Sequence, residues 1–89
     1  MRARKKPVVV EVARVADLLD AAGNGADLPG WVQAAYDAGI ILFLNDGIDI
    51  HTLEGVMHGR RDDWLIQGVQ GELYPCADTV FTATYDLVL

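Results

Sequence analysis

The stretch from Asp63 to Tyr85 constrains the fold more than any other part of the chain. Its first half is an apolar run broken by Gly68 and Gly71, residues that tolerate positive φ at little steric cost. Two β-like runs joined by a short glycine-containing turn predict a hairpin, with its turn at 69–71 and a bulge at Gly68. Pro75 ends the second strand, because proline has no N–H to give to the ladder.

A short helix is predicted directly after this hairpin. Asp78 is a candidate N-cap, because its carboxylate can accept from the amides of the first helical turn. Phe81 and Tyr85 are four residues apart, so one apolar face of the helix can lie over the hairpin. We therefore expect residues 63–85 to form a hairpin capped by a helix, with Trp64 and Phe81 largely buried.

The two ends of the chain carry a resemblance. The C-terminal pattern consists of a tryptophan strand, a Gly-Val-x-Gly-Glu-(Phe/Leu)-Tyr-Pro-Cys segment, an Asp-x-Phe element and a closing Thr-Tyr. In this chain the corresponding residues are Trp64, Gly68 to Cys76, Asp78, Phe81 and Thr84-Tyr85. With the opening Arg4 to Glu11, this pattern resembles a family of short phage and prophage proteins of unassigned function. Arg61-Asp62 stands where that family tends to have Pro-Gly before Asp-Trp. The resemblance implies a phage origin and a shared fold, and it implies no activity.

Length and hydropathy predict a single folded domain over residues 1–89. The chain is long enough for one modest core, and its apolar fraction of 52% exceeds what disordered chains carry. The longest apolar run, 39–44, is too short for a membrane helix, and charge breaks the valine run too early for a signal peptide. We therefore expect a cytoplasmic protein, acting in the host cytoplasm if it is phage-encoded, with no membrane partner.

Charge divides the chain into a basic tail and an acidic body. Four of the seven basic residues lie within residues 1–6, which we predict to be a flexible tail. Residues 7–89 hold three basic and thirteen acidic residues, a net charge of −10. Such a body repels a phosphate backbone, so nucleic-acid binding is disfavoured, although the tail alone could make salt-sensitive contacts.

Periodicity predicts an α+β domain. Alternating apolar residues and turn signals place five strands and two or three short helices along the chain, with strands near 8–15, 40–44, 48–58, 63–68 and 72–76 and helices near 16–22, 29–38 and 78–85. We expect one small, mainly antiparallel sheet of about five strands. A sheet of this size can curl into a partly open barrel, because strand twist accumulates and curling removes exposed edges.

The sequence offers no clear site for a metal or cofactor. His51 and His58 are seven residues apart, which puts them on opposite faces of an unbroken strand unless a bulge at Gly55 restores one face. Structural metal sites usually show closely spaced ligands, and none occurs here. Phosphate-binding loops, nucleophile elbows and dinucleotide fingerprints are also missing from the sequence. We predict neither a metal nor a cofactor.

A thiol or hydrolytic enzyme is the weakest reading of the chain. Cys76 could act as a nucleophile with His51 or His58 as base and Glu72 as a further acid–base group. A positive helix end behind Asp78 would lower the pKa of a nearby thiol. A lone cysteine beside a strand end is more often a buried structural residue, so we predict a protein without catalytic residues.

The reading that best fits these features is a non-enzymatic protein-interaction module, binding a partner protein or a second copy of itself. Three features support this hypothesis: an acidic surface, an expected free sheet edge and the lack of a recognisable set of catalytic residues. The candidate binding residues project from strand ends and turns: Tyr74, Glu72, Glu54, Arg60 and Arg61. The alternative is a small barrel that holds single-stranded nucleic acid with the basic tail, Arg60 and Arg61 near Tyr74 or Trp64.

Overall fold

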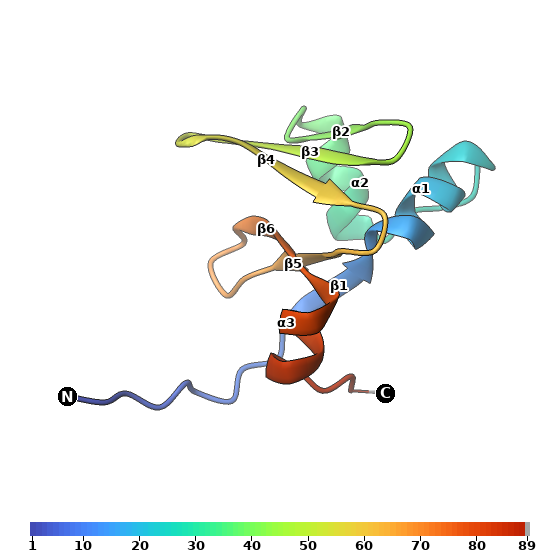
Figure 1. Cartoon of the computed structure of the whole chain (residues 1–89). Coiled ribbons are helices and arrows are strands. Elements are labelled where there is room, and N and C mark those ends of the chain that lie inside the picture. The colour runs from blue at the N-terminus through green and yellow to red at the C-terminus, as the bar shows by residue number, and fades with distance from the viewer. Residues whose placement is uncertain (89) are drawn as a thin grey trace.

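The computed structural model describes residues 1–88, and Leu89 lies outside the described residues. The protein is an α+β structure with three helices and six strands in two three-stranded antiparallel sheets (Figure 1). In chain order the elements are β1 (Glu11–Arg14), α1 (Val15–Gly23), α2 (Gly30–Asp37), β2 (Ile41–Phe43), β3 (Gly47–Thr52), β4 (Gly55–Arg60), β5 (Trp64–Gln67), β6 (Leu73–Cys76) and α3 (Asp78–Thr84).

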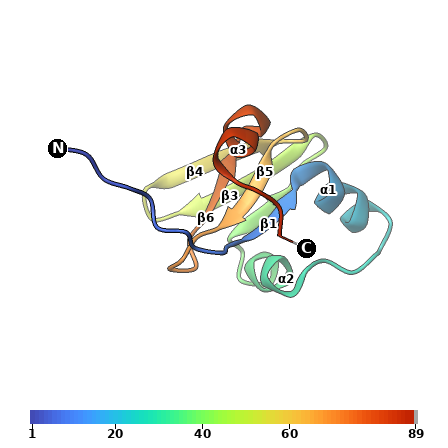
Figure 2. The same ribbon diagram turned by 90° about the horizontal axis from the view of Figure 1, so that it is seen from below.

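Sheet 1 has the strand order β1-β5-β6 and buries both of its faces. Residues directly opposite one another in an antiparallel sheet share a face. One face carries Ala13, Leu65 and Pro75, and it packs towards the main core. The other face carries Val12, Ile66 and Tyr74, and α3 covers it (Figure 2). The hairpin between β5 and β6 turns at residues 69–71, where Gly71 has a φ of 84°.

Sheet 2 has the order β2-β3-β4, so the prediction of one long strand over 48–58 is wrong. The chain reverses at Leu53-Glu54, and Gly55 has a φ of 131° that other residues rarely adopt. The Thr52 side chain closes the turn, donating to the Gly55 carbonyl at 2.8 Å and accepting from the Glu54 N–H at 3.2 Å. The Thr52 hydroxyl thus stabilises a turn that the alternating apolar pattern did not indicate.

The prediction of one five-stranded sheet, closing into a partly open barrel, is also wrong: there are two separate sheets and no closed barrel among residues 1–88. The chain passes from sheet 2 to sheet 1 through a tight turn after β4. In that turn the Arg60 N–H donates to the Asp63 carboxylate at 2.8 Å, and the Asp63 N–H donates to the Arg60 carbonyl at 3.0 Å. Because β4 and β5 enter different sheets at this turn, the consecutive strands do not form a continuous meander.

The first strand is shorter than its valine content predicts. It begins at Glu11, and the chain turns into α1 at Val15, whose side chain is fully buried. The Val15 N–H still donates to the Asp63 carbonyl at 3.0 Å, which continues the β1–β5 ladder to the helix start. Val8 and Val9 precede the strand and stay exposed. Tertiary burial of Val15 therefore decides where the strand ends.

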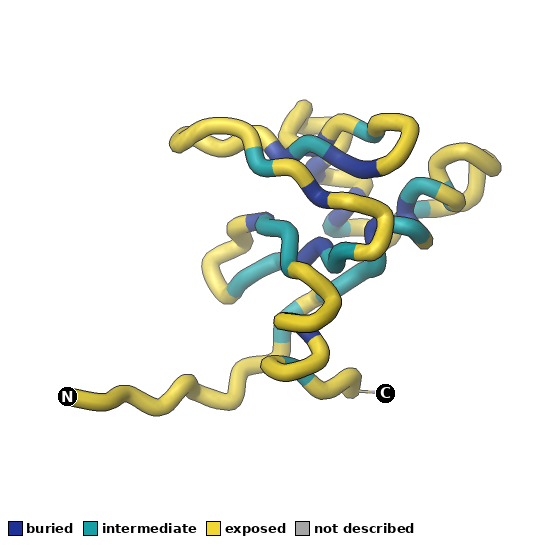
Figure 3. Tube along the Cα trace, viewed as in Figure 1, coloured by how far each residue is buried: buried dark blue, intermediate teal, exposed yellow. Residues whose placement is uncertain are grey.

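The main core lies between the two sheets and under α1 and α2 (Figure 3). Its buried members are aliphatic residues from six elements: Val15, Leu18, Val32, Ala35, Ile41, Ile48, Ile50, Leu65 and Leu73. Trp31 is partly buried and packs against this cluster. No helix among residues 1–88 has the length and apolar character needed to cross a bilayer.

A second, smaller cluster holds α3 against sheet 1. Phe81 is 4% exposed and stacks on Trp64, with ring centroids 3.9 Å apart and planes 10° from parallel. Trp64 remains partly exposed, because the seven-residue α3 covers only part of its indole. Asp78 does not cap the helix as predicted: Ala77 is the N-cap, and the Asp78 carboxylate accepts from the Trp64 indole N–H at 2.9 Å. The same carboxylate lies 3.5 Å from the Arg14 guanidinium.

Candidate functional site

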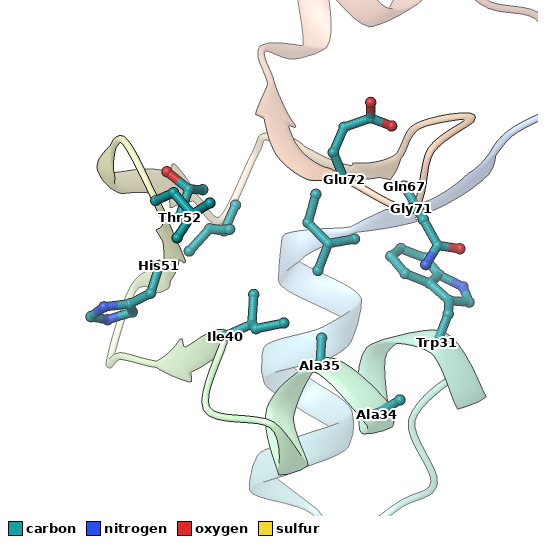
Figure 4. Close-up of a pocket in the computed structure, with 12 residues that line it drawn as sticks. Trp31, Ala34, Ala35, Ile40, His51, Thr52, Gln67, Gly71 and Glu72 are labelled. Carbon is teal, nitrogen blue, oxygen red and sulfur yellow. The ribbon is translucent and has the colours of Figure 1, made fainter.

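Two adjoining hollows open between sheet 1 and sheet 2. The first encloses about 710 Å³ between α2, the end of β3 and the β5–β6 turn. Figure 4 shows Ala35 and Ile40 pointing into this space, with the Trp31 indole beside Gln67 and Gly71. The second hollow encloses about 580 Å³ along the β3–β4 turn and the start of β6.

The hollows form one site, which we call the inter-sheet cleft, because they share Thr52, Leu53, Glu72 and Leu73 as lining residues. Leu53 at the tip of the β3–β4 turn is fully exposed, and Val56 on β4 is 56% exposed. Exposed aliphatic side chains gathered beside a concave surface are typical of a binding site.

Acidic side chains stand at the rim of the cleft. Glu54 lies in the β3–β4 turn and Glu72 lies immediately before β6, and both are exposed. The Glu72 carboxylate accepts from the Gln70 N–H at 3.1 Å. Neither carboxylate forms an ion pair with a Lys or Arg of residues 1–88. The cleft therefore presents an apolar floor with negative charge at its edge.

The outer edge of β4 offers free backbone groups beside the cleft. In the β2–β3 hairpin the Leu44 N–H donates to the Gly47 carbonyl at 2.8 Å and the His51 N–H to the Ile40 carbonyl at 2.8 Å. The odd-numbered residues of β3 therefore bond towards β2, and the even-numbered ones bond towards β4. It follows that the backbone N–H and C=O groups of Val56 and His58 point away from β3.

The facing edge of β6 is poorer in donors. The Gly68 N–H donates to the Glu72 carbonyl at 2.7 Å, so Glu72 and Tyr74 direct their backbone groups to β5. Leu73 and Pro75 direct theirs outwards, and Pro75 has no N–H. A proline at this position keeps β6 from accepting a full strand, which leaves β4 as the better edge.

The structure separates Cys76 from both histidines, although His51 and Glu72 of the enzyme hypothesis line the same hollow. Cys76 lies at the end of β6 on the face covered by α3, whereas both histidines belong to sheet 2. His58 on β4 is bound to the Asp49 carboxylate at 2.9 Å, and His51 on β3 is exposed, with its ring turned away from the cleft in Figure 4. Burial, and then the Asp63 carboxylate, raise the pKa of the Cys76 thiol, which is opposite to what a thiolate nucleophile requires.

The histidines also fail to form a ligand group. They lie on neighbouring strands of the β3–β4 hairpin, because the chain reverses between them. Among residues 1–88, no three His, Cys, Asp or Glu side chains come together in a way that could hold a metal ion.

Of the basic residues of the nucleic-acid alternative, the tail residue Lys5 lies over the Tyr85 ring, with its ammonium 4.5 Å from the ring centroid. Arg61 pairs with Asp20 at 3.0 Å, and the Trp64 ring is occupied by Phe81. Arg60 lies at the far end of β4 from the cleft and is exposed. The Trp64 ring, one of the two aromatic side chains of that alternative, is thus engaged inside the protein.

Tyr74 takes part in a hydrogen-bonded pair of phenols on the α3 side of sheet 1. Its hydroxyl lies 3.3 Å from that of Tyr85, which also accepts from the Lys5 ammonium at 3.2 Å. Burial, followed by the hydrogen bond and charge of Tyr85, raises the pKa of Tyr74 to about 12. The hydrogen bonds from Tyr74 and Lys5 lower the pKa of Tyr85.

Spectrophotometric titration of the phenolate band should therefore resolve two abnormal tyrosines. Tyr85 should ionise below the usual value of about 10, and Tyr74 only near pH 12. The raised pKa means that Tyr74 stabilises the fold fully below pH ~10 and that this contribution is lost as the pH rises through about 12. Tyr74→Phe should abolish the late step and move the Tyr85 step upwards, since Tyr85 loses a donor. Two normal, independent titrations would contradict the pairing.

The cleft includes residues that sequence reasoning did not single out for binding, chiefly Leu53 and Val56. Leu53 is an apolar residue between the polar residues Thr52 and Glu54, and the alternating pattern places it inside a single strand over 48–58. Of the predicted binding residues, Glu54, Glu72 and Tyr74 line the cleft, whereas Arg60 and Arg61 do not. Comparison with protein-family models, curated proteins and solved structures found no match to this chain.

Proposed function

We propose that this protein is a non-enzymatic interaction module that binds an extended segment of a partner protein in the inter-sheet cleft. The segment adds to sheet 2 as a strand along the edge of β4. The observation that carries the proposal is the pair of outward-facing residues on that edge, Val56 and His58, directly beside an apolar cleft. Main-chain hydrogen bonds supply affinity in this mode of recognition, and pockets for alternate side chains supply selectivity.

The lining of the cleft defines the chemistry of the segment. Side chains on one face of an added strand would lie over Leu53 and Leu73, so they should be aliphatic or aromatic. Glu54 and Glu72 at the rim, and the net charge of −10 on residues 7–89, favour lysine or arginine at the flanks. Binding should therefore weaken as salt is added.

The resemblance to short phage proteins is compatible with this proposal. A phage-encoded module of this size would act on a host protein in the host cytoplasm, and the resemblance itself supplies no activity that competes with binding. The lining of the cleft therefore defines the proposed partner, a protein with an accessible, extended segment of alternating apolar residues and basic flanks.

Selection from a displayed library of random peptides tests the proposal. The immobilised full chain should enrich peptides with alternating apolar residues and basic flanks. A selected peptide, labelled for fluorescence anisotropy, should then bind Val56→Pro at least about tenfold more weakly, because the substitution removes one outward donor of β4 without touching its bonds to β3. Failure to enrich any such peptide would overturn the proposal.

Leu53→Ser and Val69→Ser provide a matched pair for the same measurement. Both residues are exposed aliphatic side chains at the tips of hairpin turns, but only Leu53 lines the inter-sheet cleft. Neither change should alter the unfolding midpoint. The peptide should lose affinity for Leu53→Ser and bind Val69→Ser as it binds the wild type. Equal affinity for both variants would place the binding site elsewhere.

A further inference from the structure

The outer edge of β1, a strand of four residues, is unpaired and lies on the far side of sheet 1 from the inter-sheet cleft. The segment before β1 continues it as an exposed valine run, with Val8 50% and Val9 79% exposed. Figure 1 shows the chain before β1 passing beside α3 before it runs out from the protein, and Val8 and Val10 line a shallow hollow with Tyr74 and Tyr85. An exposed valine-rich edge of this kind is a template for pairing with another strand.

The direction of the backbone groups on this edge follows from one bond. Val15 and Asp63 continue the β1–β5 register, and the Val15 N–H donates to the Asp63 carbonyl at 3.0 Å. Odd-numbered residues of β1 therefore bond towards β5, and the even-numbered residues Val8, Val10 and Val12 face the free edge. Among residues 1–88, Val8 and Val10 make no backbone hydrogen bond to another segment.

Pro7 does not block this edge. The β1–β5 register ends at Glu11 and Gln67, so no residue of β5 lies opposite Pro7. In a strand extended back from β1, Pro7 falls in the odd-numbered series, so its missing N–H lies on the side away from the new partner. This position differs from that of Pro75 on β6, which removes a donor from the outer side. The β1 edge is thus left competent for pairing, while the β6 edge is protected.

We propose that two copies of this chain associate through their β1 edges, pairing antiparallel about a two-fold axis into a continuous six-stranded sheet. Charge complementarity points to a second copy as the occupant. Antiparallel pairing lays the basic tail of one copy, residues 1–6, along residues 10–15 of the other, where Glu11 is the acidic residue that the tail meets.

The register of this pairing is determined by the same features. Only outward-facing, even-numbered residues can form the hydrogen-bonded pairs, so Val8 pairs with Val8 of the second copy, and Lys6 with Val10. This register places Lys5 directly opposite Glu11, an opposite-charge pair that occurs twice by symmetry. A shift of two residues towards the C-terminus loses that pair. Each register opposes two arginines, Arg2 with Arg14 here and Arg4 with Arg14 after the shift, so the Lys5–Glu11 pair distinguishes them. In the dimer Lys5 exchanges its contact with Tyr85 for Glu11 of the second copy.

Sedimentation velocity of the full chain, from micromolar to millimolar concentration at low salt, tests the association. A concentration-dependent dimer is expected. Lys5→Glu and Glu11→Lys should each weaken the dimer at least about tenfold, because each change creates two like-charge contacts. The double variant Lys5→Glu with Glu11→Lys should restore it. A monomer at all concentrations, or a double variant as weak as the singles, would overturn the proposal.

Disulfide trapping tests the register separately, in a Cys76→Ser background that leaves no other thiol. Val8→Cys should oxidise rapidly to a covalent dimer, since the two Val8 Cα atoms would lie about 5.5 Å apart. Val9→Cys is the matched control, because Val9 faces Pro7 of the second copy. Cross-linking of Val9→Cys as fast as Val8→Cys, or open-ended oligomers in place of a dimer, would contradict this arrangement. Both experiments are independent of peptide binding in the inter-sheet cleft.

Discussion

Phe81→Ala is expected to lower the free energy of unfolding by about 3–5 kcal/mol, the usual cost of truncating a buried aromatic side chain. Phe81 is 4% exposed and stacks on Trp64 at 3.9 Å between ring centroids. Its loss leaves α3 with no other fully buried side chain. Because small domains are stabilised by only about 5–15 kcal/mol, this loss removes a large share of the total and should move the unfolding midpoint to a much lower urea concentration.

Urea denaturation followed by tryptophan fluorescence measures this loss, and two variants serve as controls. Val80→Ala lies on the same helix but on an exposed position, so its midpoint should match the wild type. Tyr74→Phe keeps the ring on the α3 face of β6 and removes only the hydroxyl bonded to Tyr85, so its effect should be small. A Phe81→Ala protein with a wild-type midpoint would show that α3 does not hold sheet 1.

Gly47→Ala is the second substitution with a large expected effect. A Cβ at this position would overlap the carbonyl oxygen of Gly59 and come within 3.1 Å of the His58 ring. The carbonyl belongs to the β4 backbone, which cannot move without breaking the start of the β3–β4 ladder. Overpacking of this kind typically costs about 1–3 kcal/mol, and the fixed carbonyl should place this site at the upper end.

Gly23→Ala is the matched control for this glycine. Its Cβ would meet nothing within 4 Å, and its φ lies outside the positive range that favours glycine. It should therefore stabilise the protein by about 0.4–1 kcal/mol, because alanine restricts the unfolded chain. Thermal unfolding of both variants beside the wild type should move the midpoints in opposite directions. Two midpoints shifted alike would rule out the clash at Gly59.

The candidate site was only partly accessible from the sequence. Glu54, Glu72 and Tyr74 were recognisable as polar groups near strand ends, and all three line the inter-sheet cleft. The cleft itself exists because β3–β4 and β5–β6 belong to different sheets, which no local pattern records. The exposure of Leu53 follows from the reversal of the chain at residues 53–54. The alternating pattern of the sequence predicts a single strand across these residues.

Local sequence determined the elements whose signals are short-range. The β5–β6 turn, the start of α3 at Asp78 and the burial of Phe81 follow from glycines, from proline and from the spacing of apolar residues. The sequence also predicts Asp78 as an N-cap, but in the structure its carboxylate accepts a hydrogen bond from the indole N–H of Trp64, fourteen residues away. A carboxylate in this position can accept from its own helix or from a distant donor. Tertiary packing determines which of the two lies within hydrogen-bond distance.

Only the tertiary structure decided how the hairpins combine into sheets. The same alternating residues could form one sheet or two, because strand pairing satisfies the backbone equally well in either case. The choice depends on contacts between distant segments, such as Val15 with Asp63 and the close approach of Gly47 to Gly59. Those contacts bury aliphatic residues from six elements in one core, and that shared burial selects two sheets over a single curled one.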